Sequence, residues 1–169
     1  MITVAILGAG DVGGSAAHAL ARGERVRRAL LIDEAGTVAA GKALDIQQAG
    51  AVDGFHTRVD GTNDLTRVTG CAAVVIADGW TGEAALAAMV RLRGLLGDAP
   101  IVFAGAGQSD LMLALAREAR FDRRRLVGSA GEALAGAARA MVAMEANCSP
   151  SEVALSVLGA PPSGFVVPW

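Results

Sequence analysis

The sequence has few of the residues that build metal centres, disulfide frameworks or nucleic-acid surfaces. Its 169 residues include two cysteines and two histidines, and Cys71 and Cys148 lack the C-x-x-C spacing of a metal or redox site. We therefore expect no metal, and so little cysteine is typical of a reducing compartment. The basic residues are fourteen arginines and one lysine, scattered apart from residues 123–125, so we expect no nucleic-acid binding.

Long hydrophobic runs are also missing. No apolar stretch has the length that spans a bilayer, and Met1 leads into an apolar segment without the basic region of a signal peptide. We expect no membrane segment and a soluble, cytoplasmic protein. The composition is 53% hydrophobic, the mean hydropathy is +0.44 and the net charge is −2, which together predict one domain with a generous core.

Apolar runs alternate with helical patterns along the chain. The runs are continuously apolar, as strands buried on both faces require. We expect strands at residues 2–7, 29–33, 72–77, 100–104 and 125–128, a weak strand at 55–59, and a last strand at 153–158 before an irregular segment at 159–164. We expect helices at residues 12–22, 37–49, 83–96, 109–120 and 131–146. This alternation predicts an α/β fold with a doubly wound parallel sheet.

The N-terminal segment carries a dinucleotide-binding fingerprint. An apolar run ending at Leu7 leads into G-x-G-x-x-G, formed by Gly8, Gly10 and Gly13, and Asp33 follows twenty residues later. The glycines permit a tight turn, approach of the backbone to a pyrophosphate and close packing of helix on strand. Asp33 is expected to hold the adenosine ribose hydroxyls. Gly-rich turns also arise for purely structural reasons, so the prediction depends on strand, helix and distal acid being in register.

Five further segments follow the order and spacing of malate and lactate dehydrogenases. They are residues 40–49, 61–64, 74–76, 125–128 and 157–159. The chain resembles the nucleotide-binding domain of that family and stops where the family's substrate domain would continue. The resemblance implies a single Rossmann domain over residues 1–169, with 145–169 leading toward the substrate domain, and NAD as cofactor. The implied cofactor contacts are Gly8, Gly10, Asp11, Val12, Gly13, Asp33, Ala77, Asp78, Gly79 and Gly107.

The catalytic set that the resemblance implies is missing from this sequence. A 2-hydroxy-acid dehydrogenase needs an imidazole base, an acid that orients it and arginines that clamp the substrate carboxylate. At the positions matching the family's motifs, Pro161 replaces the histidine, Leu134 the acid and Ala137 an arginine. Residues 77–83 replace an arginine-bearing lid with a shorter loop that has no positive charge. We therefore expect no catalytic residue.

The other histidines and arginines are not expected to replace this set. His18 and His56 do not reach the C-terminal edge of the sheet, where a base would meet the nicotinamide. Arg139 is turned around its helix from the family's arginine position, so we interpret it as an exposed helix residue. Arg91 and Arg93 are interpreted as solvated helix residues.

Two acidic residues bear on the strength of NAD binding. Asp11 lies inside the Gly-rich turn, and Asp78 stands where the family has a small neutral residue lining the cofactor channel. A carboxylate at a helix N-terminus is stabilised by the partial charge that attracts a pyrophosphate, so it competes with the ligand. For Asp11 an outward orientation is equally consistent with the motif. We expect weak NAD binding, preferred over NADP because Asp33 repels a 2′-phosphate and Glu34, not arginine, follows it.

Three functions stay open at this stage. The first is a non-catalytic pseudo-dehydrogenase that acts as nucleotide sensor, scaffold or partner of another protein. The second is a dehydrogenase whose catalytic groups come from another chain or whose substrate is unlike malate. The third is a structural module that has lost the cofactor.

Two segments suggest contacts with other chains. In malate and lactate dehydrogenases the helix matching 37–49 packs on its two-fold mate, so we expect a homodimer, although this face can also pack on its own sheet. The residues of this face, most of them small or apolar, are Ala39, Ala40, Ala43, Leu44, Ile46 and Gln47. The apolar tail, residues 165–169, is expected to dock on its own domain, a symmetry mate or a partner, over the substrate pocket and stiffened by Pro161 and Pro162.

Overall fold

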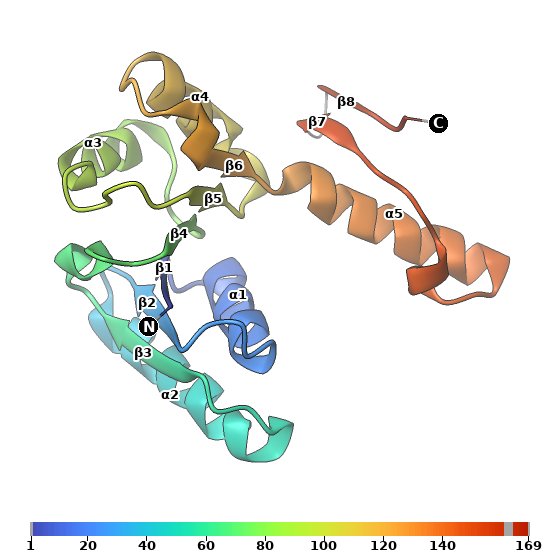
Figure 1. The fold of residues 1–169 in the computed structure, drawn as a ribbon, viewed down its shortest axis with the longest axis horizontal. Coiled ribbons are helices and arrows are strands. Elements are labelled where there is room, and N and C mark those ends of the chain that lie inside the picture. The colour runs from blue at the N-terminus through green and yellow to red at the C-terminus, as the bar shows by residue number, and fades with distance from the viewer. Residues whose placement is uncertain (1, 161–163, 169) are drawn as a thin grey trace. The chain divides into compact units, whose positions relative to one another are not determined.

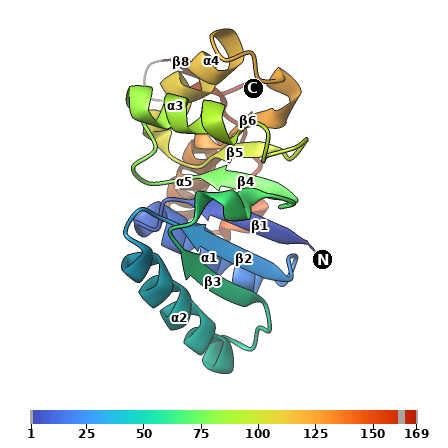
Figure 2. The ribbon, with the colours of Figure 1, turned by 90° about the vertical axis from the view of Figure 1, so that its left-hand side faces the viewer.

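The computed structural model describes residues 2–160 and 164–168 and divides into two compact units, Met1–Val127 and Gly128–Trp169. In this part of the chain six strands form one sheet in the order β3-β2-β1-β4-β5-β6 (Figure 1; Figure 2). They are β1 (Thr3–Leu7), β2 (Arg28–Ile32), β3 (Arg58–Thr62), β4 (Ala73–Ile76), β5 (Ile101–Phe103) and β6 (Leu126–Gly128). The strand order is that of a Rossmann fold, which confirms the predicted fold class.

The strands are joined by helices on both faces of the sheet. The first unit contains α1 (Asp11–Arg22), α2 (Gly36–Asp53), α3 (Gly82–Leu92) and α4 (Ser109–Arg117). The short 3-10 turns of this unit are Leu65–Val68, Ala106–Gln108 and Arg123–Arg125. The pairs β1–β2, β1–β4, β2–β3 and β4–β5 are all parallel, so the strand order reverses between β1 and β4. Ligands of such folds bind at this switch point.

Two hydrophobic clusters explain why the strands are continuously apolar. Ile6 of β1 packs with Ala17 of α1 on one face, whereas Leu7 packs with Met89 of α3 and Leu115 of α4 on the other. All five side chains are fully buried. Because successive residues of a strand point to opposite faces, a sheet covered on both faces needs apolar residues at every position.

Several element boundaries differ from the sequence predictions. The second helix does not stop at residue 49 but continues to Asp53, where Gly54 ends it in the left-handed conformation with φ +78°. The strand expected at 55–59 begins later, at Arg58, because its parallel pairing with β2 begins there and runs to Thr62. α3 and α4 end at Leu92 and Arg117, several residues before their predicted ends.

The second unit contains α5 (Ala130–Ala146), a 3-10 turn (Pro150–Glu152) and a hairpin of β7 (Leu158–Ala160) and β8 (Gly164–Val166). The strand predicted at 153–158 is wrong, since residues 153–157 have no regular structure. This segment lies against α5, where Arg139 donates to the Leu155 carbonyl. The irregular segment predicted at 159–164 is also wrong at both ends, which pair in the hairpin. Residues 161–163 lie outside the described chain.

The apolar tail pairs through its backbone but keeps its side chains half exposed. β8 forms an antiparallel ladder with β7, while Phe165, Val166 and Val167 are 43%, 61% and 38% exposed. Trp169, Pro161 and Pro162 lie outside the described residues. Docking of the tail over a substrate pocket stays a prediction. The single domain over residues 1–169 also stays a prediction. Within residues 2–160 and 164–168, no helix combines the length and apolarity needed to cross a membrane.

Candidate functional site

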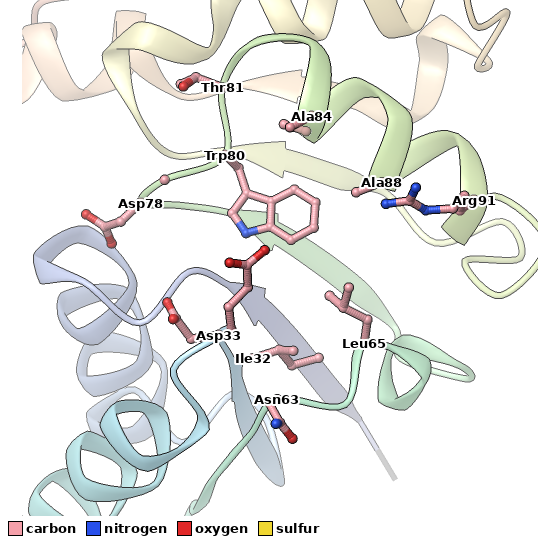
Figure 3. Close-up of a pocket in the computed structure, with 13 residues that line it drawn as sticks. Ile32, Asp33, Asn63, Leu65, Asp78, Trp80, Thr81, Ala84, Ala88 and Arg91 are labelled. Carbon is pink, nitrogen blue, oxygen red and sulfur yellow. The ribbon is translucent and has the colours of Figure 1, made fainter.

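A cavity of about 320 Å³ lies at the carboxyl ends of β2, β3 and β4, beside the switch point of the sheet (Figure 3). The Trp80 indole forms part of its wall, with Ile32 and Asp33 facing it on one side and Ala84 and Ala88 on the other. The lining residues are Ile32, Asp33, Glu34, Asn63, Leu65, Asp78, Gly79, Trp80, Thr81, Ala84, Ala85, Ala88 and Arg91. The cavity is therefore where the fingerprint predicts a nucleotide.

The three fingerprint glycines are packed too tightly for any side chain. Gly8 has φ +100°, and a Cβ there would lie 2.3 Å from the carbonyl oxygen of Asp78. A Cβ on Gly13 would lie 1.9 Å from the carbonyl oxygen of Gly8, which is the close packing of helix on strand that the motif predicts. A Cβ on Gly10 would lie 2.5 Å from Cγ of Asp78. The close approach at the second glycine is thus made by a side chain of the chain itself.

Asp33 lies where the distal acid of the fingerprint is expected, directly after β2. One carboxylate oxygen accepts the N–H of Ala9 at 2.8 Å, and the other accepts the N–H of Ala35 at 2.9 Å. These bonds fix the side chain between the Gly-rich loop and α2, at the wall of the cavity. A carboxylate has acceptor capacity beyond two hydrogen bonds, so Asp33 can also accept from ribose hydroxyls.

Asp78 binds the N-terminus of α1. Its Oδ2 accepts the N–H of Gly13 at 2.7 Å and its Oδ1 accepts the N–H of Val12 at 3.2 Å. The contact forms because Leu7 and Ile76 are in register, so the loops after β1 and β4 begin side by side. α1 has Gly10 as its N-cap and no capping side chain of its own, so Asp78 supplies the missing acceptor.

The electrostatic surroundings keep Asp78 ionised. Burial raises the pKa of its carboxyl, but the N–H donors of Gly13 and Val12 and the positive charge of Lys42 lower it more. The pKa of Asp78 therefore lies below its usual value. A carboxylate that accepts two backbone N–H groups is favoured in its charged form.

Asp11 points into solvent, which resolves the two orientations left open by the sequence. Its side chain is fully exposed, 4.0 Å from Nζ of Lys42. Lys42, from α2, donates to the carbonyl oxygen of Gly10 at 2.8 Å and so holds the Gly-rich loop from outside. The sequence analysis did not single out Lys42, although it is the chain's one lysine among fourteen arginines.

The other predicted cofactor contacts lie on the loops after β4 and β5. Ala77 is buried, Gly79 is exposed with φ +75°, and Gly107 is exposed in the 3-10 turn after β5. Gln108, which the sequence analysis missed, joins these loops. Its side chain is 2% exposed, donates to the Ala77 carbonyl and accepts the N–H of Gly105 at 3.0 Å. Contact of these residues with a cofactor stays a prediction.

The positions of the absent acid and arginine lie on α5, within the second unit. Leu134 is half-buried and Ala137 is exposed. The interpretation of Arg139 as an exposed residue is wrong, because its guanidinium binds the Leu155 carbonyl at 3.1 Å and the Glu132 carboxylate. Pro161 lies outside the described residues.

Both histidines and Arg93 have contacts within the chain. His18 pairs with Asp53 at 2.9 Å, and His56 contacts the carboxylate of Glu24. Arg93 is not only solvated, since its guanidinium lies 4.7 Å from the centre of the Phe121 ring. Arg91 is exposed, as expected, but lines the cavity. Among residues 2–160 and 164–168, no three His, Cys, Asp or Glu side chains gather as metal ligands.

Known proteins are similar to this chain in both sequence and fold. The family model of the lactate/malate dehydrogenase NAD binding domain matches residues 2–85. The malate dehydrogenase of Methanosarcina mazei is 30% identical over 173 residues, which are 94% of this chain and 56% of that protein. The malate dehydrogenase of Roseiflexus sp. (strain RS-1) is 29% identical over 170 residues, 92% of this chain and 55% of that protein. The chain thus spans about half the length of these curated relatives.

Solved structures agree with this likeness. Malate dehydrogenase from Salinibacter ruber superposes with a TM-score of 0.82 at 25% identity, covering 98% of this chain and 57% of that one. Lactate dehydrogenase from Cryptosporidium parvum, complexed with lactic acid and β-nicotinamide adenine dinucleotide, has a TM-score of 0.85 at 21% identity, covering 98% and 56%. At 21% identity, the similarity to the Cryptosporidium parvum enzyme shows a common fold alone. Residues 2–85 thus belong to the NAD binding domain of the lactate/malate dehydrogenase family, and the Rossmann sheet of the chain agrees with this match.

Proposed function

We propose that this chain is a cytoplasmic nucleotide-binding protein that binds NAD weakly, performs no hydride transfer and acts as a sensor, scaffold or partner subunit. One contrast carries the proposal. The Gly-rich loop, Asp33 and the cavity are assembled at the switch point, whereas Pro161, Leu134 and Ala137 stand where the family has its base, acid and arginine. The free thiols of Cys71 and Cys148 are consistent with a reducing compartment.

The absence of hydride transfer follows from the chemistry of the side chains. Oxidation of a 2-hydroxy acid requires a group that takes the hydroxyl proton. The side chains of proline, leucine and alanine have no group that can accept a proton. Loss of a positioned base alone costs a factor of about 10²–10⁴ in rate. Here the residue that orients the base and one that clamps the carboxylate are replaced as well.

A turnover assay tests this proposal. The purified chain is mixed with NADH and oxaloacetate or pyruvate, and with NAD and malate or lactate, and absorbance of NADH is followed. We expect rates at background, while calorimetry detects NAD binding. NADH oxidation that disappears in the Asp33→Ala variant would show a working active site and refute the proposal.

A second candidate is a dehydrogenase whose catalytic groups come from another polypeptide. It is favoured by the curated relatives named malate dehydrogenase, at 29% and 30% identity. The same assay on protein isolated with its native partners separates the two. Activity that appears only in the isolated complex, and tracks with its second component, would favour this candidate.

We also propose a homodimer through α2. Part of the predicted face packs on the chain itself, since Ala39, Ala43 and Ile46 are buried, but Ala40 and Leu44 remain exposed. Gln47 is also engaged within the chain, accepting the N–H of Val59 at 2.8 Å. The surface available to a second copy is therefore narrower than the sequence predicts. Light scattering at micromolar concentration should give a dimer mass, and a monomer mass would exclude it.

A further inference from the structure

The anion-binding end of α1 is already in use within the folded chain. The N–H groups of Val12 and Gly13, which in a G-x-G-x-x-G loop face the pyrophosphate, both donate to the carboxylate of Asp78. The carboxylate comes from the loop after β4, 65 residues along the chain from Gly13. It therefore serves as an internal anion at a helix N-terminus.

The space next to the second glycine is filled by the same side chain. A Cβ on Gly10 would lie 2.5, 2.7 and 2.9 Å from Cγ, Cβ and Oδ1 of Asp78. The missing side chain of Gly10 is what permits a ligand phosphate to reach the loop in this motif. The Asp78 carboxylate thus occupies both the donors and the room that a pyrophosphate requires.

The nucleoside end of the site has no such occupant. Asp33 faces the cavity, and Leu65 and Trp80 supply apolar and aromatic surface beside it (Figure 3). The cavity of about 320 Å³ reaches Asp78 but lies on the side of β2 and α3. An uncharged nucleoside can enter there while the Asp78 contacts with Val12 and Gly13 remain.

We propose that Asp78 occupies the pyrophosphate subsite and thereby sets the ligand class of this pocket. An adenine nucleoside without phosphate binds unopposed, whereas a dinucleotide must first displace the Asp78 carboxylate. Two charge-assisted hydrogen bonds must then be exchanged, and the displaced carboxylate remains a negative charge near the diphosphate. The inference rests on the proposed nucleotide binding and gives a structural reason for the weak NAD binding proposed above.

Calorimetric titration of the full chain with adenosine, ADP-ribose and NAD tests the inference. Asp78→Ala should raise the affinity for NAD and ADP-ribose roughly tenfold or more. The two charge-assisted hydrogen bonds of Asp78 no longer compete with the pyrophosphate, and the free energy of about one such bond corresponds to a tenfold change in affinity. Adenosine affinity should change by less than about twofold, because its binding leaves Asp78 in place. Asp78→Ser, which keeps a small capping hydroxyl, provides a second variant if the alanine variant folds poorly.

Asp98→Ala is the matched control. Asp98 is an exposed acid in the turn before β5, at the amino-terminal end of the strands, whereas Asp78 lies at their carboxyl end. Its removal changes the net charge by the same amount. It should leave all three affinities unchanged, whereas a rise equal to that of Asp78→Ala would reduce the effect to general electrostatics and overturn the inference. Equal NAD affinity in the parent and both Asp78 variants would overturn it too, while leaving nucleotide binding intact. If no form binds any of the three ligands, the proposed function fails as well.

Discussion

The two halves of the nucleotide site differ in what fills them. In the nucleoside half, Asp33 is held by the N–H groups of Ala9 and Ala35 at the wall of an open cavity. In the phosphate half, Val12 and Gly13 donate to Asp78, so the helix N-terminus already has its anion. Both halves rest on acidic side chains that accept backbone N–H groups, but only the first leaves room beside them.

In this chain an intact fingerprint motif does not by itself leave the phosphate-binding N–H groups free. The fingerprint glycines meet their steric requirements, and a family model matches this region as an NAD binding domain. The availability of the loop, however, depends on Asp78, which lies outside the motif and reaches it only through the register of β1 with β4. A single carboxylate from outside the motif therefore occupies two N–H donors of the Rossmann loop.

The largest effect is expected from a substitution that distorts the Gly-rich loop, which borders both halves of the site. Gly13→Ala would place a Cβ 1.9 Å from the carbonyl oxygen of Gly8, so the loop must shift, at a cost of about 3 kcal/mol in unfolding free energy. Gly41→Ala is the control, because a Cβ added at this position would have no atom within 4 Å. This substitution should stabilise α2 by roughly 0.5–1 kcal/mol. Urea unfolding compares the two. Equal stability of both variants would mean that the loop is loosely packed.

Removing Asp33 tests the nucleoside half. Asp33→Ala should weaken both adenosine and NAD roughly tenfold to a hundredfold, because hydrogen bonds to a charged acceptor contribute about 1.5–3 kcal/mol. Glu34→Gln, a neighbouring acid that also lines the cavity, should weaken them less, as only Asp33 is fixed at the Gly-rich loop. Calorimetry gives the affinities. A larger loss of affinity in the Glu34 variant would indicate that Glu34, and not Asp33, contacts the ribose.

The same acid should discriminate between the two nicotinamide dinucleotides. NADP should bind roughly tenfold or more weakly than NAD, because a 2′-phosphate would meet the carboxylates of Asp33 and Glu34 at the cavity wall. Substitution Asp33→Ser should narrow the gap. NADP binding as tight as NAD in the parent chain would contradict this placement of the ribose.

The pH dependence of stability gives the smallest effect and concerns the phosphate half. Burial raises the pKa of Asp78, but the donors Gly13 and Val12 and the charge of Lys42 leave it below the usual value. A lowered folded-state pKa means that the ionised form stabilises the fold above the unfolded pKa of about 3.9. This contribution is lost as the pH falls through the folded-state pKa. Asp78→Asn should thus be less stable than the parent at pH 7, with the gap shrinking at pH 3, in thermal melts; a gap independent of pH would contradict the ion–helix contact.

Local sequence signals predicted the fold better than they predicted the site. The Gly-rich turn and the apolar runs fix β1, α1 and β2 because each depends on neighbouring residues. The end of α2 was underestimated, since nothing before Gly54 breaks the helix. The run 153–158 looks like a strand, but a strand needs a partner, and residues 153–157 lie along α5.

The state of the site depends on contacts between distant segments. The sequence places Asp78 where the family has a small residue, but not on the N–H groups of Val12 and Gly13. It also raised Asp11 as a competitor with the ligand, and the structure turns that side chain into solvent. Gln108 and Lys42 escaped notice because their partners are backbone carbonyls of other loops.

Because the nucleoside half of the site is open and the phosphate half is filled, the parent chain should distinguish adenosine from NAD. The chain has two tryptophans, so Trp169→Phe leaves Trp80, in the wall of the cavity, as the fluorescent reporter of binding. Adenosine and NAD are titrated side by side at neutral pH. Adenosine should bind at least as tightly as NAD. NAD binding roughly tenfold or more tightly than adenosine would show that the pyrophosphate contributes to binding and that the phosphate half is not blocked.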